Sequence, residues 1–181
     1  TLVGVISADT SLHLPDFRAA ERTFQLLTQV AGRAGRGERP GEVVVQTYAP
    51  DHYSIQAART HDYRAFYAKE IAARSELGYP PFTELVSLVV SHRDAATARD
   101  VASRMAAVAS SAAKERGIEV LGPAPAPFAR LRGRYRWQLA LKGTDPGLVG
   151  DVVRLARDRT REFVLSAGAD TTVDVNPLSL L

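Results

Sequence analysis

The chain has 181 residues, of which 45% are hydrophobic and 24% charged, and its formal net charge is +3. This composition predicts a globular protein of one to two small domains, and it offers no apolar run of about 18 residues that could span a membrane. Cysteine is absent and the four histidines are scattered, which excludes disulfides and predicts no metal site. The first residue is not Met and no signal peptide is recognisable, so we expect a piece of a longer, cytoplasmic protein with no membrane partner.

The first part of the chain has the pattern of a strand–helix–strand unit. Residues 1–9 and 42–49 are nearly continuous apolar runs, which is typical of parallel strands covered on both faces. After a loop at 10–15, a helix is expected to begin at Pro15 and Asp16 and to end at a pair of glycines. This order predicts an α/β lobe with a parallel sheet.

Two more helices and a domain boundary are expected next. Asp51 and Asp62 are candidate caps for these helices, and Gly78 is the expected end of the second. Tyr79-Pro80-Pro81-Phe82 cannot continue a helix, because proline lacks an amide hydrogen and restricts the residue before it. The predicted domains are residues 1–80 and 81–181.

The second domain is predicted to follow the order β-α-β-β-α-β. The expected elements are a strand at 85–91, a helix from Asp94 to Gly117, a short strand at 118–121, a proline-rich loop, a strand at 134–142, a helix from Thr144 or Asp145 to Gly168, and a strand at 171–175. This order is that of ferredoxin-like domains, in which two helices cover one face of an open sheet.

One motif on the first helix has the chemistry of a phosphate site. It comprises residues 29–36, and at about 100° per residue Gln29, Arg33 and Arg36 share one face of the helix. Gly32 removes a side chain beside these arginines, and a guanidinium binds phosphate through two parallel hydrogen bonds. The alternative is a glycine-rich helix end with two solvated arginines, whose charge suits the helix dipole.

A second basic pattern lies in the expected strand of the second domain. The arginines recur at every second position: Arg130, Arg132, Arg134 and Arg136. Alternate residues of a strand share a face, so Arg134, Arg136 and Lys142 are predicted to line the open face of the sheet, while Tyr135 and Trp137 face the helices. Arg130 and Arg132 are predicted to continue the row into the preceding loop. Such a row can follow a phosphate backbone. The alternative is a solvated face that keeps the sheet from aggregating.

Several motifs resemble those of one helicase family. Residues 29–36 are similar to motif VI of superfamily 2 helicases. Further stretches are similar to the primosomal protein N′ (PriA) family: D-F-R-x-A-E-R at 16–22, Pro-Pro-Phe at 80–82, R-G-R-Y-R-W-Q at 132–138 and D-V-N-P at 174–177. The resemblance implies part of a RecA-like lobe followed by a C-terminal domain that is ferredoxin-like and similar in fold to ribosomal protein S ten.

The resemblance also implies a function. The chain would be the C-terminal part of an ATP-dependent DNA helicase that recognises stalled replication forks and initiates primosome assembly. Arg33 and Arg36 would contact the γ-phosphate of ATP, with Gln29 and Gly32 beside the nucleotide. ATP, Mg²⁺ and zinc would be held upstream, since the phosphate loop, acidic box and cysteine-rich insertion are absent from this sequence. We therefore expect no bound cofactor and no ATP hydrolysis by this chain alone.

The partners implied by the resemblance are forked and single-stranded DNA, the acidic tail of single-stranded DNA-binding protein, and other primosome proteins. The arginine row would supply the DNA contacts. Two alternatives remain: a docking module for DNA or protein without any ATPase role, and a different superfamily 2 enzyme with an unrelated accessory domain.

Overall fold

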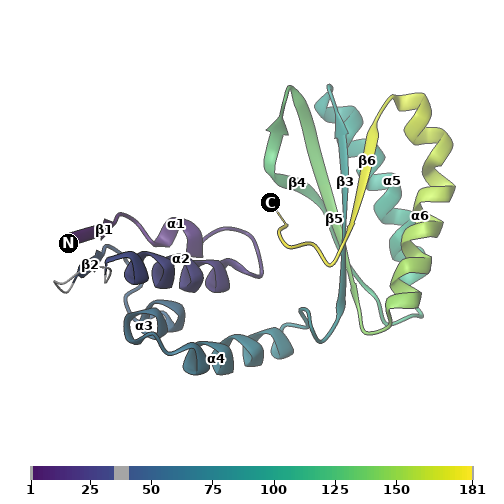
Figure 1. Ribbon diagram of the computed structural model, residues 1–181. Coiled ribbons are helices and arrows are strands. Elements are labelled where there is room, and N and C mark those ends of the chain that lie inside the picture. Colours follow the sequence, from purple (N-terminus) through teal and green to yellow (C-terminus); the bar gives the residue numbers. More distant parts are fainter. Residues whose placement is uncertain (1, 35–40, 181) are drawn as a thin grey trace. The chain divides into compact units, whose positions relative to one another are not determined.

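A computed structural model describes residues 2–34 and 41–180, which form an α/β structure (Figure 1). The chain divides into two compact units, Thr1–Glu76 and Leu77–Leu181. The described part of the first unit contains a two-stranded parallel sheet, and that of the second a four-stranded antiparallel sheet. The predicted α/β fold class is confirmed. No helix in the described residues is long and apolar enough to cross a membrane.

The sheet of the first unit joins β1 (Leu2–Val5) to β2 (Glu42–Val45) in parallel. The parallel pairing agrees with the prediction, although both strands are shorter than the apolar runs at 1–9 and 42–49. Beyond the strands, two backbone hydrogen bonds continue the pairing, from the amide of Gln46 to the carbonyl of Val5 at 2.9 Å and from the amide of Ala8 to the carbonyl of Gln46 at 3.1 Å. The remaining apolar residues therefore belong to the turns that follow each strand.

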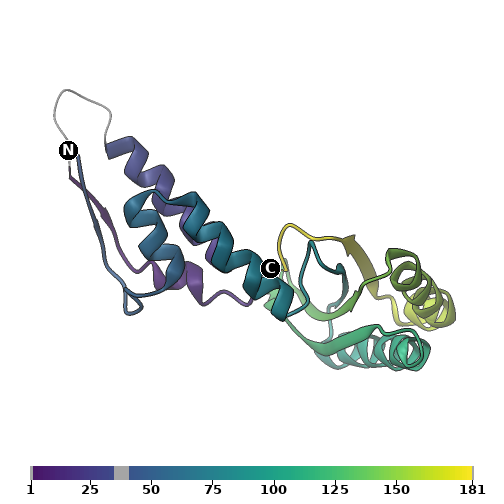
Figure 2. The same ribbon diagram turned by 90° about the horizontal axis from the view of Figure 1, so that it is seen from below.

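The two faces of this sheet differ in burial. Val5 and Val45 pack against the buried cluster around Phe24, whereas Leu2 and Val44 are 69% and 53% exposed. The prediction that both faces are covered is therefore wrong for the described residues. The reason is that the helices of this unit lie on one side of the strands (Figure 2).

The helices α1 (Asp9–Leu12) and α2 (Ala19–Ala34) connect the two strands. Helix α1 lies where a loop at 10–15 was predicted. Helix α2 begins later than predicted, because the carboxylate of Asp16 accepts a hydrogen bond from the backbone amide of Arg18 at 2.9 Å and forms a turn ahead of the helix. The predicted end of this helix, at two glycines, lies outside the described residues.

Two further helices, α3 (Tyr53–Thr60) and α4 (Tyr63–Glu76), complete the first unit. Asp62 caps α4 as predicted, since its carboxylate accepts a hydrogen bond from a backbone amide of the first turn at 2.9 Å. The cap predicted for α3 at Asp51 is wrong. The ring of His52 takes this role, because the backbone at His52 is extended and its Nδ1 reaches an amide of the first turn.

The second unit is an antiparallel sheet with two helices on one face (Figures 1 and 2). Its elements are β3 (Glu84–His92), α5 (Ala95–Ala113), β4 (Glu119–Leu131), β5 (Arg134–Gly143), α6 (Pro146–Ala167) and β6 (Asp170–Val175). The strand order β4-β5-β3-β6 is that of the predicted ferredoxin-like arrangement. Asp94 and Asp145 cap the two helices, with carboxylate-to-amide distances of 2.8 and 3.1 Å.

The core of the second unit lies between the sheet and these helices. It comprises apolar side chains from β3, β5, α5 and α6, including Leu88, Val101, Leu139, Val149 and Ala156, all with almost no exposed surface. Burying a residue of this size stabilises the fold by roughly 1.5–3 kcal/mol. The second unit thus has a continuous core of its own, which leaves the opposite face of the sheet open.

Strand β4 corrects the prediction of a short strand at 118–121 followed by a proline-rich loop. The strand continues through the prolines to Leu131, with irregularities in its register after Leu121 and after Pro125. Proline is tolerated there because β4 is an edge strand, which needs ladder donors on one side only. The turn into β5 has φ of 50° at Arg132 and 77° at Gly133, which is the backbone of a type I′ hairpin.

Candidate nucleic-acid interface

The open face of the second sheet brings together three of the predicted arginines. Arg132, Arg134 and Arg136 line one open depression of about 300 Å³, beside Gln138. The other residues that line it are Ser87, Val89, Ser91, Leu131, Thr172, Asp174, Ser179 and Leu180. They come from β3, β6, the hairpin and the segment after β6. The depression is therefore polar and basic along β5, with apolar side chains at its margin.

The alternation of β5 explains why these arginines share a face. Leu139 and Leu141 are buried under the helices, and Trp137 packs against the same core as predicted. Successive side chains of a strand point to opposite faces, so Arg134 and Arg136 point away from the helices. The hairpin turn adds Arg132 to the same depression.

The arginines of the depression differ in how their charges are compensated. Arg134 forms an ion pair with Asp170 at 2.6 Å, and its guanidinium donates a hydrogen bond to the carbonyl of Ser91 at 2.9 Å. Within the described part of the chain, neither Arg132 nor Arg136 forms an ion pair. Arg132 and Arg136 therefore have guanidinium charges that an added anion could neutralise, while Arg134 mainly holds β5 to its neighbours.

Arg130 does not continue the row, and this element of the prediction is wrong. Arg130 lies directly opposite Tyr135 in the hairpin, and its guanidinium carbon is 5.2 Å from the centre of that ring. Residues directly opposite in an antiparallel pair share a face, so Arg130 lies on the face that carries Tyr135. The reason is the two-residue turn, which places Leu131 opposite Arg134. Even-numbered residues at the end of β4 therefore lie opposite odd-numbered residues of β5, on the other face from Arg134 and Arg136.

Lys142 lies on the same face as the arginines but outside the depression. Its Nζ donates a hydrogen bond to the carbonyl of Leu77 at 2.9 Å and forms an ion pair with Glu119 at 2.9 Å. The same Nζ is 4.9 Å from the ring centre of Tyr79. These contacts tie the start of the second unit to its sheet, so Lys142 is already engaged within the protein.

The predicted nucleotide-facing residues lie on the outer face of α2. Gln29, Gly32 and Arg33 are exposed, and Arg36 lies outside the described residues. A Cβ atom added at Gly32 would meet no other atom within 4 Å, so packing within the described chain does not require glycine there. Glycine in a helix costs about 1 kcal/mol relative to alanine. The structure thus leaves Gln29, Gly32 and Arg33 uncovered on one face of α2 within the described residues.

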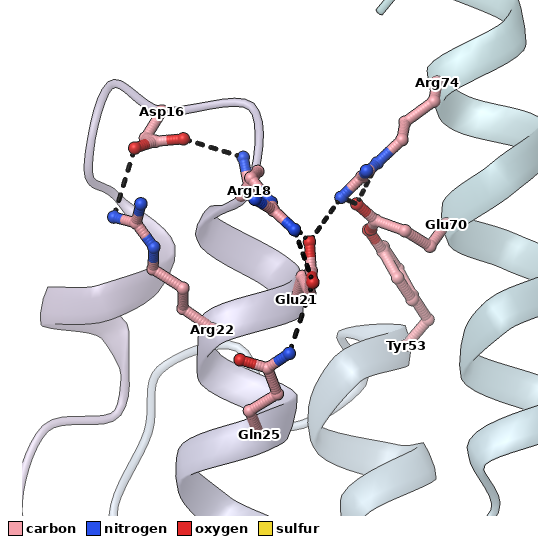
Figure 3. A network of polar contacts seen from close by, with 8 residues as sticks. All are labelled: Asp16, Arg18, Glu21, Arg22, Gln25, Tyr53, Glu70 and Arg74. Atoms are coloured by element: carbon pink, nitrogen blue, oxygen red, sulfur yellow. Dashed lines mark hydrogen bonds and ion pairs between the residues drawn. The ribbon is translucent and has the colours of Figure 1, made fainter. Parts of the chain in front are cut away.

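A network of ion pairs holds α2 against α4 (Figure 3). The guanidinium of Arg74 on α4 contacts Glu21 of α2 at 2.7 Å and Glu70 at 2.6 Å. Arg18 binds Glu21 from the other side at 2.8 Å, and the hydroxyl of Tyr53 donates a hydrogen bond to Glu70 at 2.6 Å. Three helices therefore meet at two largely buried carboxylates, and the position of α2 depends on them.

The electrostatics of this network follow from its contacts. Burial opposes ionisation of Glu21, but hydrogen bonds from Arg18 and Arg74 outweigh it and lower the pKa of Glu21. Burial and the hydrogen bond to Glu70 raise the pKa of Tyr53, which keeps its hydroxyl protonated as a donor. Burial alone would lower the pKa of Arg74, but its two carboxylate partners raise it. The network is thus stable in its charged form near neutral pH.

Sequence reasoning missed this network. The stretch D-F-R-x-A-E-R served there only as a family resemblance, whereas the structure shows its contacts, including an ion pair of Arg22 with Asp16 at 3.1 Å. The spacings Arg18–Glu21 and Glu70–Arg74 are helical i,i+3 and i,i+4 pairs that the sequence could have revealed. Among the described residues, no group of histidine and acidic side chains is arranged to hold a metal ion.

A family model and the similar sequences agree on one family. The model of the primosomal protein N C-terminal domain matches residues 75–178. Replication restart protein PriA of Bacillus subtilis is 43% identical over 181 residues, which cover 100% of this chain and 22% of that protein. The PriA proteins of Synechocystis and Treponema pallidum are each 42% identical over 99% of this chain, and over 21% and 27% of their own lengths.

The chain therefore spans about a fifth to a quarter of the length of these relatives. Among solved structures, a hydantoinase/carbamoylase family amidase from Burkholderia ambifaria aligns with 51% of this chain and 27% of its own, at a TM-score of 0.37 and 15% identity, which is too low to bear on fold or function. The family model covers more than half of the chain, and the PriA relatives match nearly all of it. The chain belongs to the PriA family of replication restart proteins.

Proposed function

We propose that this chain is the C-terminal part of an ATP-dependent DNA helicase that recognises stalled replication forks and initiates primosome assembly for replication restart. Its relatives carry the name of replication restart proteins and match it along its whole length. They are also four to five times longer, judged from the shares they cover. The phosphate loop and acidic box that ATP hydrolysis requires would lie in that additional length.

In the longer protein, α2 presents its outer face to ATP. Arg33 and Arg36 stabilise negative charge on the γ-phosphate, and Gln29 contacts the nucleotide where Gly32 leaves room for it. ATP and Mg²⁺ supply the phosphoryl group and its counter-charge, while this chain contributes positioned guanidiniums. The exposed Arg33 and the unfilled space at Gly32 support this proposal.

The second unit binds DNA through the arginine depression. The single observation that carries this assignment is that Arg132 and Arg136 open onto one depression without an ion pair within the described residues. Arg132 in the hairpin turn and Arg136 on β5 lie on either side of Arg134, which lets the two guanidiniums contact separate parts of a phosphate backbone. Single-stranded and forked DNA expose such a backbone without requiring base-specific contacts.

The same depression suits an acidic peptide. Leu131, Val89 and Leu180 give it an apolar margin beside the arginines, and peptides with acidic and terminal carboxylate groups bind in such basic pockets. We therefore propose the acidic tail of single-stranded DNA-binding protein as a protein partner, together with other primosome proteins.

A docking module without any ATPase role is the second candidate function. The separate core of the second unit favours it, because this unit needs no nucleotide site to present its open face. The two candidates differ in the longer protein. The helicase requires Arg33 for DNA-dependent ATP turnover, whereas the docking module does not.

The experiment that tests DNA binding compares two double variants of the 181-residue chain. Arg132→Ala with Arg136→Ala removes the two uncompensated cations, while the control, Arg116→Ala with Arg130→Ala, removes two cations elsewhere. Affinity for fluorescent single-stranded DNA is measured by anisotropy across a salt series. Each lost phosphate contact lowers the slope of log affinity against log salt by about 0.7, so we expect a slope smaller by roughly 1.4 in the first variant only. Equal slopes in both variants would refute the assignment.

A further inference from the structure

The segment after β6 is turned by Asn176, within the D-V-N-P stretch. Asn176 has a φ of 48°, in the left-handed region that asparagine tolerates better than most residues. Its backbone amide donates a hydrogen bond to the carbonyl of Leu85 at 2.7 Å, and its side-chain oxygen accepts one from the amide of Leu85 at 3.2 Å. Asn176 thus ends the pairing of β6 with β3 and redirects the chain.

The redirected segment lies on the open face of the sheet. Pro177 is buried, and Ser179 and Leu180 are half-buried where they line the depression with the arginines. The ribbon turns from the end of β6 back toward β4 and β5 rather than toward the helices (Figures 1 and 2). Ser179 and Leu180 would therefore compete with a ligand of the arginines for the same surface, whereas Leu178 is 75% exposed.

The chemistry of this segment makes it a displaceable cover. Residues 178–180 are Leu-Ser-Leu and carry no acidic side chain, so they leave the charges of Arg132 and Arg136 without a counter-charge. A polyanion offers what the segment does not, namely charge-assisted hydrogen bonds to both guanidiniums. The anchor at Asn176 and Pro177 keeps the segment near the depression when it is displaced.

We propose that residues 178–180 are a built-in occupant of the arginine depression, which nucleic acid displaces when it binds. This inference rests on the proposed DNA-binding function of the depression. The protein then has a state in which the segment lies over part of the depression, as in the structure, and a state that exposes the whole depression, and DNA binds the second state more tightly. The apparent affinity for DNA is the intrinsic affinity multiplied by the fraction of open molecules.

Two variants move DNA affinity in opposite directions. A chain that ends after Pro177 lacks the cover. If the cover occupies the depression about nine-tenths of the time in the full chain, the truncated chain is expected to bind DNA about tenfold more tightly. Leu180→Glu, in contrast, adds a carboxylate to the cover and is expected to weaken binding. Its charge-matched control is Leu165→Glu on α6, where the side chain is 68% exposed.

A second measurement detects the cover without DNA. Phenylglyoxal modifies accessible arginines, and mass spectrometry of the modified protein gives the rate at each site. Truncation after Pro177 is expected to accelerate modification at the half-buried Arg136 but to leave Arg132, which is already exposed, and Arg130, on the other face, unchanged. Trp137 fluorescence, which reports on the core of the second unit, verifies that the truncated chain folds.

The outcomes separate this inference from the proposed function. An unchanged modification rate at Arg136 would overturn the cover, whatever the DNA affinity. Weaker or unchanged DNA binding by the truncated chain would overturn the competition, since a segment that helped to hold DNA would lose affinity on removal. If the rates rise while the Arg132 and Arg136 variants bind DNA like the control, the cover stands and the DNA-binding function fails.

Discussion

Replacing Arg74 by methionine tests the idea that one guanidinium fixes α2 against α4. Methionine keeps much of the length and the apolar stem of arginine but removes the charge shared by Glu21 and Glu70. The three side chains are 14%, 19% and 9% exposed, so water replaces the lost contacts poorly. Glu21 retains Arg18, while Glu70 retains, among the residues that the structure describes, only the hydrogen bond from the hydroxyl of Tyr53.

The magnitude follows from the burial of these groups. Removing one partner of a buried ion pair costs 3–5 kcal/mol, because the remaining charge is left without compensation. Arg18 still neutralises Glu21, so we expect the lower end of that range, about 3 kcal/mol. Such a loss raises the population of the opened first unit by roughly two orders of magnitude.

The stability deficit of Arg74→Met is expected to depend on pH through the titration of Glu21. The folded state lowers the pKa of Glu21 below its ordinary value of 4.5, so its stabilisation is present above pH 4.5 and is lost as pH falls through the folded pKa. Without Arg74, Glu21 loses one of the two cations whose hydrogen bonds lower its pKa, so less of this stabilisation remains to be lost at low pH. The deficit of Arg74→Met relative to the wild type is therefore largest near pH 7 and becomes smaller below pH 4.5.

Hydrogen exchange detected by mass spectrometry measures the effect locally. Peptides from Ala19–Ala34 and Tyr63–Glu76 are expected to exchange about a hundredfold faster in Arg74→Met, while Trp137 fluorescence reports an unchanged second unit. The control is Arg64→Met, an exposed arginine on the same helix. Wild-type exchange rates in both peptides, or a deficit that is the same at pH 4 and pH 7, would refute the reasoning.

Two further predictions concern the nucleotide-facing helix and a helix cap. In the longer protein, Arg33→Ala is expected to lower DNA-dependent ATP turnover by about 10³ or more without changing DNA affinity. Turnover is measured as phosphate release, and the control is the exposed Arg59→Ala. Similar turnover in the two variants would contradict the role of Arg33. Asp145→Ala is expected to destabilise the second unit by about 1 kcal/mol, because the amide of Leu148 loses its acceptor, whereas Asp145→Asn retains most of the stability. Urea unfolding followed by Trp137 fluorescence measures the stability of both variants. Equal unfolding midpoints for Asp145→Ala and Asp145→Asn would contradict the cap.

Local patterns in the sequence determined the fold class and most element boundaries of the second unit. Asp94 and Asp145 are followed by helical periodicity, and both cap helices in the structure. Such signals are reliable because a cap and the amides that it accepts from are three residues apart or fewer. Continuous apolarity was a weaker guide, since it predicted coverage of both faces of β1 without any information on what packs there.

The tertiary structure alone decided which charges act together. Arg130 and Arg132 are two residues apart, yet the hairpin places them on different faces, because a two-residue turn exchanges odd and even positions. Glu21 and Arg74 are 53 residues apart and form one of the shortest ion pairs of the first unit. Periodicity describes one element at a time, whereas these contacts depend on the register between strands and on the packing of one helix against another.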